Sequence, residues 1–357
     1  MRAALAALEQ ARARTMALVE PLSREQLVGV HSPLQSPLVW DVGHIAAFED
    51  LWLVHRHGGE PLLRAELASV YDAFETPRSV RGAAPLLEPA EALHYLGAVR
   101  ERALVVADRV GLGDGVLGEL VARHELQHQE TMLQTLALAR IPSAELPGSA
   151  AALGAVTAHA DLEFVEIDAG PCMIGAPPDG FAYDNERPCH EVELEAFRIG
   201  RAPVSNASFR AFVEEDGAER PAGWTADGRE WRLRGLEPLD PAKPVMHVSW
   251  FAADAFARSR GARLPTEREW ERAAAEPGLL EGVGEVWEWT ASEFRGYPGF
   301  VAHPYRAYSE VFFDSGHMVL RGGSGASAAR VVGPTFRNWD LPQRRQIFAG
   351  LRIATDG

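Results

Sequence analysis

The chain has 357 residues, of which 46% are hydrophobic, so it is long enough for two domains that each bury a core. Its formal net charge of -15 argues against a general nucleic-acid binder, and its two cysteines are too few for a secreted disulfide scaffold. The N-terminal segment is amphipathic and lacks the features of a signal peptide, and no apolar run reaches the roughly 18 residues of a membrane span, so we expect a cytoplasmic protein.

The first part of the chain predicts a bundle of four helices. Apolar residues recur at three- and four-residue spacing in segments 2–19, 38–57, 89–110 and 116–139. The connection 60–88 is too long for a simple turn, so we expect it to have a function. Ile141-Pro142 ends the last helix, and the small residues of 143–160 are typical of a linker. The sequence thus predicts domains at 1–142 and 161–357.

The second domain shows a different pattern. Short β-prone runs are separated by Gly, Pro and Asp at 162–170, 190–200 and 243–250, and helix-like segments lie near 205–215 and 250–260. The remainder, 275–357, is rich in Gly, Trp, Tyr and Pro and has little periodicity. The pattern predicts an irregular α+β domain held together by aromatic packing.

The run RHELQHQET contains the strongest local indication of a site. His124 and His128 are four residues apart, so on a helix both imidazoles project from one face. His44, on the second predicted helix, could supply a third ligand from a facing helix. Three neutral imidazoles suit iron, zinc or copper and leave coordination positions open. Asp41 and Glu130 are candidate acceptors for the second nitrogens of the ligand rings.

The same letters support other interpretations. A histidine pair at this spacing also occurs on solvated helix faces. HELQH matches H-E-x-x-H, the zinc-protease signature, in which Glu125 would act as general base. The local motif therefore leaves two metal chemistries open.

Several runs in the second domain carry a resemblance to a known family. DNERPCHEVELEAFRIG, PVMHVSWFAADAFARSRGARLPTEREWERAA, VWEWTAS, VLRGGS and FRNWDLPQRRQIFAGLRIA occur in this order and resemble the formylglycine-generating-enzyme (sulfatase-modifying factor) fold, which is C-type-lectin-like. The first domain resembles the DinB-like four-helix bundle. The combination resembles the EgtB family of ergothioneine-type sulfoxide synthases. Formylglycine generation itself is not expected, because it needs a late cysteine pair and residues 190–357 contain no cysteine.

The resemblance implies a chemistry. Iron(II) and dioxygen would serve to join a thiol or selenol donor to N-α-trimethylhistidine (hercynine), with oxidation of the sulfur to a sulfoxide. The metalloprotease interpretation weakens accordingly. We expect γ-glutamylcysteine as the favoured donor, or else cysteine; the alternatives are selenoneine synthesis from a selenosugar and, more remotely, a non-catalytic lectin-like binding module. We expect a monomer that binds neither nucleic acid nor membrane.

The resemblance also assigns roles to individual residues. The implied iron ligands are His44, His124 and His128. Tyr305 resembles the tyrosine that donates a proton during the reaction, and a phenol is a weak acid suited to that task. The implied acceptor-binding residues are Gln127, Tyr308, Asn338 and Trp339. The implied donor-binding residues are Arg78, Arg81, Asp340 and Arg344. Trp faces attract quaternary ammonium groups and arginines capture carboxylates, so these assignments are chemically coherent.

The sequence departs from the family pattern in three places. Gly325 replaces a common Trp, Glu285 replaces a usual Asn, and the stretch between EREWERAAAE and VWEWT lacks a long insert. The short stretch removes a loop and bears on whether a structural calcium site of the parent fold is present. These departures bear on the identity of the donor more than on the iron site.

Overall fold

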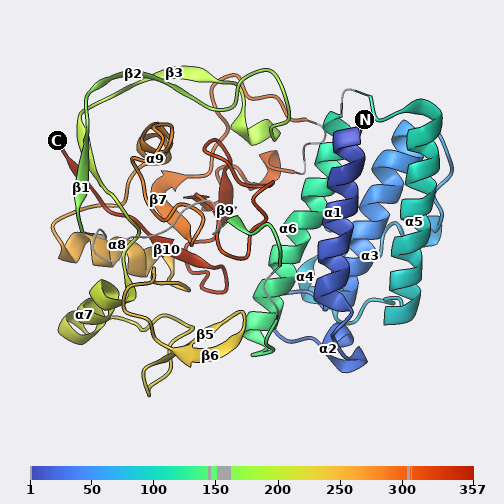
Figure 1. Cartoon of the computed structure of the whole chain (residues 1–357), viewed down its shortest axis with the longest axis horizontal. Helices are drawn as coiled ribbons and strands as arrows, with labels where there is room; N and C mark the ends of the chain where they lie inside the picture. Colours follow the sequence, from blue (N-terminus) through green and yellow to red (C-terminus); the bar gives the residue numbers. More distant parts are fainter. Residues whose placement is uncertain (1, 114, 144–145, 151–161, 304–305, 307) are drawn as a thin grey trace. The chain divides into compact units, whose positions relative to one another are not determined.

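The computed structural model describes all residues except 1, 114, 144–145, 151–161, 304–305 and 307. The chain forms two compact units, each with its own set of elements (Figure 1). The first unit comprises residues 1–147 and 233–235, and the second comprises 148–232 and 236–357. Most of the predicted linker, 143–160, lies outside the described residues.

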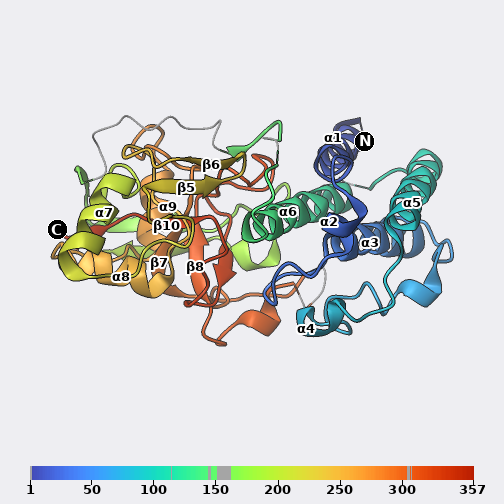
Figure 2. The same ribbon diagram turned by 90° about the horizontal axis from the view of Figure 1, so that it is seen from below.

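The first unit is the predicted helical bundle. Its long helices are α1 (Arg2–Val19), α3 (Leu38–Glu49), α5 (Pro89–Val110) and α6 (Val116–Leu138). Shorter helical segments are α2 (Arg24–Val28), η2 (Ala65–Leu67) and α4 (Arg78–Arg81). Helix α1 packs against α6, and α3 packs against both α5 and α6 (Figure 2). The four-helix prediction is confirmed: each long helix carries an apolar face repeated every 3.6 residues, and the bundle buries these faces against one another.

The second predicted helix changes its hydrogen-bonding pattern near the middle. Helix α3 ends at Glu49 and continues as a π-helix, η1 (Asp50–His57). The Asp50 side chain accepts a hydrogen bond from the backbone N–H of Leu63 at 2.7 Å, which ties the returning chain to this turn. π-Helical turns are frequent beside functional sites, and this one begins shortly after His44.

The second unit is a mixed α+β fold, as predicted. Its strands are β1 (Phe164–Ile167), β2 (Gly170–Ile174), β3 (His190–Leu194), β4 (Phe197–Gly200), β5 (Arg229–Arg232), β6 (Gly235–Pro238), β7 (Trp287–Glu293), β8 (Met318–Arg321), β9 (Asn338–Asp340), β10 (Ala349–Leu351) and β11 (Ala354–Asp356). They form a β1-β4-β11 sheet, a β10-β7-β8-β9 sheet and the pairs β2-β3 and β5-β6. The helices are α7 (Asn206–Asp216), α8 (Trp250–Ser259) and α9 (Glu267–Ala274).

The prediction of a strand at 243–250 is wrong. Residues 243–249 are irregular apart from one bridge between Ser205 and Pro244, His247 has a φ of +61°, and Trp250 already begins α8. A left-handed residue interrupts an extended strand, so the apolar residues of the segment reach the core without pairing as a ladder. Val245 and Val248 are both buried.

The core of the second unit combines aromatic rings with buried ion pairs. Trp270, Trp287 and Trp289 are almost fully buried, as the predicted aromatic packing requires. Three arginines are also completely buried, each paired with a glutamate: Arg321 with Glu271, Arg337 with Glu267, and Arg352 with Glu288. Both cysteines are free and partly exposed. Among the described residues, no helix is long and apolar enough to cross a membrane.

Candidate metal centre

The bundle brings the three predicted histidines together. His44 comes from α3, and His124 and His128 come from successive turns of α6. One ring nitrogen from each residue lies within 4.8 Å of the other two, and the Nε2 atoms of His44 and His124 are 3.1 Å apart. Two nitrogens bound to one ion at about 2.1 Å and at right angles would be about 3 Å apart, so this spacing fits a shared ion.

Two of the three rings are oriented by hydrogen bonds at their other nitrogen. Nδ1 of His44 donates to the backbone carbonyl of Tyr71 at 2.6 Å, and Nδ1 of His128 contacts Oδ1 of Asp41 at 2.9 Å. With a proton on Nδ1, the Nε2 lone pair is free to bind a metal. Of the two acceptors predicted from the sequence, Asp41 makes this contact, and Glu130 is buried on α6.

Aromatic rings stack against two of the imidazoles. The His44 ring stacks on Trp40 with centroids 4.6 Å apart, and the His124 ring stacks on Phe48 at 3.6 Å. Trp40 is fully buried, and its Nε1 donates to the carbonyl of Val70 at 3.0 Å. These contacts restrict ring rotation, so the three nitrogens converge before any ion binds.

Burial keeps the three imidazoles neutral. It lowers the pKa of His44 and of His128 to about 3, and it lowers that of His124 well below the usual value. Neutral imidazole is the form that ligates metals, so protons compete with an ion only in acid. Burial also raises the pKa of Asp41 to about 7, and its Oδ2 has no hydrogen-bond partner among the described residues. Three neutral nitrogen donors beside a buried carboxylate fit a divalent cation.

The contact between Asp41 and His128 yields a first prediction. Asparagine at position 41 can still accept the Nδ1–H of His128 but carries no charge. We expect Asp41→Asn to weaken metal binding about 10- to 100-fold, the usual effect of altering such a partner. Competition with a metal-sensitive dye measures this affinity, with Asp216→Asn, at the exposed end of α7, as the control. Equal affinities in both variants would show that the carboxylate does not act on the ligand.

Glu125, the glutamate of HELQH, belongs to an ion-pair cluster rather than to the histidine site. The Glu125 carboxylate accepts hydrogen bonds from Arg12 at 2.9 Å, Arg100 at 3.2 Å and Thr15 at 2.7 Å. Arg12 and Arg100 also bind Glu49 of α3, so this four-residue charge cluster joins α1, α3, α5 and α6. A general base must be able to reach the proton that it removes. Glu125 is 1% exposed and engaged by two guanidinium groups, so the zinc-protease interpretation is not supported.

The predicted donor-binding arginines of the first unit differ in environment. Arg81 is buried, its guanidinium lies 3.4 Å from the centroid of the Trp40 ring, and its N–H groups donate to Thr76, Ser36 and Ala73. Arg78, on the same short helix, is exposed. The positive charges of Arg78 and Arg81 both help to lower the pKa of His128. The segment that follows Tyr71 therefore places both arginines close enough to interact electrostatically with this histidine.

The other predicted substrate-binding residues lie in two places. Gln127 is half-buried on α6 beside His128. In the second unit, Asn338, Trp339 and Asp340 form β9, and the Tyr308 ring meets Trp339 edge to face at 5.9 Å. Arg344 pairs with Asp340 at 3.8 Å. The structure thus brings Tyr308 and Arg344 together with β9 within the second unit, whereas Gln127 belongs to the first. Tyr305 lies outside the described residues.

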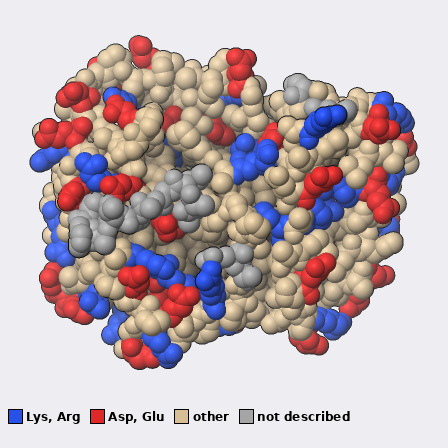
Figure 3. Space-filling view, viewed as in Figure 1, with Lys and Arg blue, Asp and Glu red and all other residues tan. Residues whose placement is uncertain are grey.

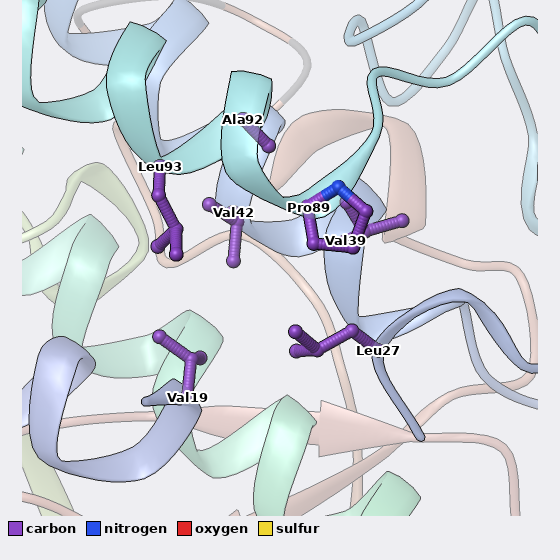
Figure 4. Close-up of a pocket in the computed structure, with 7 residues that line it drawn as sticks. All are labelled: Val19, Leu27, Val39, Val42, Pro89, Ala92 and Leu93. Carbon is purple, nitrogen blue, oxygen red and sulfur yellow. The ribbon is translucent and has the colours of Figure 1, made fainter. Parts of the chain in front are cut away.

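A pocket elsewhere in the bundle is chemically different. It is lined by Val19, Leu27, Val39, Val42, Pro89, Ala92 and Leu93 (Figure 4). These side chains have no polar groups, so the pocket is unsuited to an ionic substrate. On the face that Figure 3 shows, acidic and basic side chains are interspersed.

Comparisons with known proteins cover both units. The sulfatase-modifying factor enzyme 1-like domain family matches residues 151–278 and 275–357, and the DinB superfamily matches residues 7–132. A hercynine oxygenase from Mycolicibacterium thermoresistibile is 38% identical, over 97% of this chain and 93% of that protein. One from Mycobacterium tuberculosis is 38% identical, over 98% of this chain and 97% of that protein. Ergothioneine biosynthesis protein 1 of Schizosaccharomyces pombe is 29% identical, over 48% of this chain and 27% of that protein.

Proposed function

Since the chain belongs to the hercynine oxygenase family and is therefore an oxidoreductase, we propose that it joins a thiol donor to hercynine in ergothioneine biosynthesis. The metal in this proposal is iron(II), held by His44, His124 and His128, and dioxygen is the co-substrate. The observation that carries the proposal is the convergence of three neutral imidazole nitrogens within 4.8 Å of one another. The near full-length similarity to two hercynine oxygenases supports the choice of acceptor.

The donor set suits the proposed ion. His44, His124 and His128 would hold the ion through three nitrogens, and a set of only three protein ligands would leave room for substrates. Iron bound there would supply the redox chemistry that dioxygen requires. The protein's own part is to keep the imidazoles neutral and correctly oriented, through burial and through the contacts at Nδ1.

The favoured donor is γ-glutamylcysteine. Arg78 is an exposed cation on α4 that can capture a carboxylate. Arg81 uses three of the five N–H groups of a guanidinium within the protein, which leaves two for a ligand. The family resemblance assigns Asp340 and Arg344 to donor binding as well, and their ion pair offers both signs of charge, as an α-amino and a carboxylate group require.

The acceptor hercynine carries a quaternary ammonium and a carboxylate. Trp339 is half-buried and suits the ammonium, because an indole face attracts such cations. Asn338 and Tyr308 can donate hydrogen bonds to the carboxylate. We assign Gln127 to the acceptor imidazole, because it neighbours His128 on α6.

Product analysis tests this proposal directly. Iron-loaded protein is incubated in air with hercynine and, separately, with γ-glutamylcysteine, cysteine or a selenosugar, and the products are identified by mass. A sulfoxide conjugate with γ-glutamylcysteine is the expected result. Turnover with the selenosugar alone would replace the proposal by selenoneine synthesis. A protein that retains no iron and makes no conjugate would instead be a non-catalytic binding module.

The proposed proton donor yields a second prediction. We expect Tyr305→Phe to retain metal and both substrates but to lose carbon–sulfur coupling, so that the thiol is simply oxidised. The ratio of conjugate to oxidised thiol measures the effect. The control is Tyr297→Phe. The Tyr297 hydroxyl is buried without a hydrogen-bond partner among the described residues, so removing it should cost little stability. An unchanged ratio in Tyr305→Phe would remove this role.

A further inference from the structure

We propose that Tyr71 is a positioning residue for the metal centre, acting on His44 through its backbone carbonyl and held in place by its ring against Gly43. The proposal rests on the proposed metal centre, and it adds residues that neither the sequence motifs nor the relatives' names indicate. Tyr71 lies in the long connection between the second and third predicted helices, where no periodicity marks it.

The first step is the contact with the ligand. The Tyr71 carbonyl accepts the Nδ1–H of His44 at 2.6 Å, across 27 residues of sequence. A carbonyl can only accept, so this bond requires the proton on Nδ1 and leaves Nε2 as the free donor atom. Nε2 of His44 is the atom that faces His124.

The second step is that the carbonyl is placed by the side chain of the same residue. The Tyr71 ring is 1% exposed and lies against the backbone of Gly43. A Cβ at position 43 would lie 2.8 Å from Cδ1 of Tyr71 and closer still to Cε1 and Cζ, which is far inside van der Waals contact. Glycine at 43 is therefore what allows the ring, and with it the carbonyl, to approach α3.

The third step is that the remaining bonds of Tyr71 fix its segment. Its hydroxyl accepts the backbone N–H of Leu87 at 2.9 Å, and its own N–H donates to Leu67 at 3.1 Å. The neighbouring carbonyl, of Val70, accepts from Nε1 of Trp40 at 3.0 Å. The ring cannot move aside without displacing the acceptor of the His44 proton.

The test is a double-mutant cycle with Gly43→Ala and Tyr71→Leu. We expect Gly43→Ala to weaken Co²⁺ binding about 10- to 100-fold and to alter the absorption spectrum of bound Co²⁺. Tyr71→Leu makes room for the new methyl group, so the double variant should bind more tightly than the two separate losses predict. The matched control is Gly97→Ala on α5, where a Cβ would meet nothing within 4 Å.

A measurement on the metal-free protein separates this proposal from the proposed function. Nitrogen-15 NMR of the histidine rings should show His44 protonated at Nδ1 in the wild type and a mixture of tautomers in Gly43→Ala. A folded Gly43→Ala protein with unchanged tautomer and Co²⁺ affinity would overturn the role of Tyr71. Strictly additive losses in the cycle would also overturn it, because the two residues would then act independently. If the wild-type protein binds no metal but its tautomer still differs from that of Gly43→Ala, the proposed function alone is overturned.

Discussion

Replacing His128 with alanine is expected to abolish tight metal binding and, with it, formation of the conjugate. The substitution removes one of three ligand nitrogens and leaves Asp41 without its imidazole partner. Because altering an outer partner already weakens binding about 10- to 100-fold, loss of a ligand should exceed that range. Metal content after gel filtration and conjugate yield by mass measure the two effects.

The control for this variant is His94→Ala. His94 is exposed on α5, so its loss should leave both metal content and turnover unchanged. Full iron content in His128→Ala would show that the ion is bound elsewhere, and the proposed centre would have to be abandoned.

Replacing Glu125 with glutamine is expected to destabilise the bundle by about 3–5 kcal/mol, the usual effect of breaking a buried ion pair on one side. Arg12 and Arg100 would then share Glu49 as their only anionic partner in the cluster. The free energy of unfolding in urea measures the loss. Glu9→Gln, at an exposed position of α1, should change it little.

The same variant separates the two chemistries that HELQH allows. If Glu125 were a general base, Glu125→Gln should abolish peptide hydrolysis and leave the free energy of unfolding almost unchanged. If Glu125 is a member of the charge cluster, Glu125→Gln should lower the free energy of unfolding. A stable Glu125→Gln protein would therefore contradict the structural role assigned to Glu125.

The bundle was predictable because its determinants are local. A helix with apolar residues every three or four positions defines its buried face within one segment, and the four long helices were placed almost to their observed ends. The change to a π-helix at Asp50 was not predictable from this pattern, because the same apolar spacing suits both forms.

The second domain was harder to predict because its pairings are distant in sequence. Trp287 of β7 pairs with Ala349 of β10, and Val319 of β8 pairs with Trp339 of β9. No short window contains both partners of such a ladder, so 275–357 showed little periodicity. Helix α9 was also missed, although its capping box, Thr266 with Glu269, is visible in the sequence.

By itself the sequence determined the helical bundle, the shared face of His124 and His128, and the α+β character of the second half, because each depends on residues within a few positions of one another. Tertiary structure alone decided which face of α3 presents His44, that Tyr71 orients its ring, and that Glu125 belongs to an ion cluster with Arg12 and Arg100. These partners lie 25 to 113 residues apart, and only packing of the helices brings them within hydrogen-bonding distance.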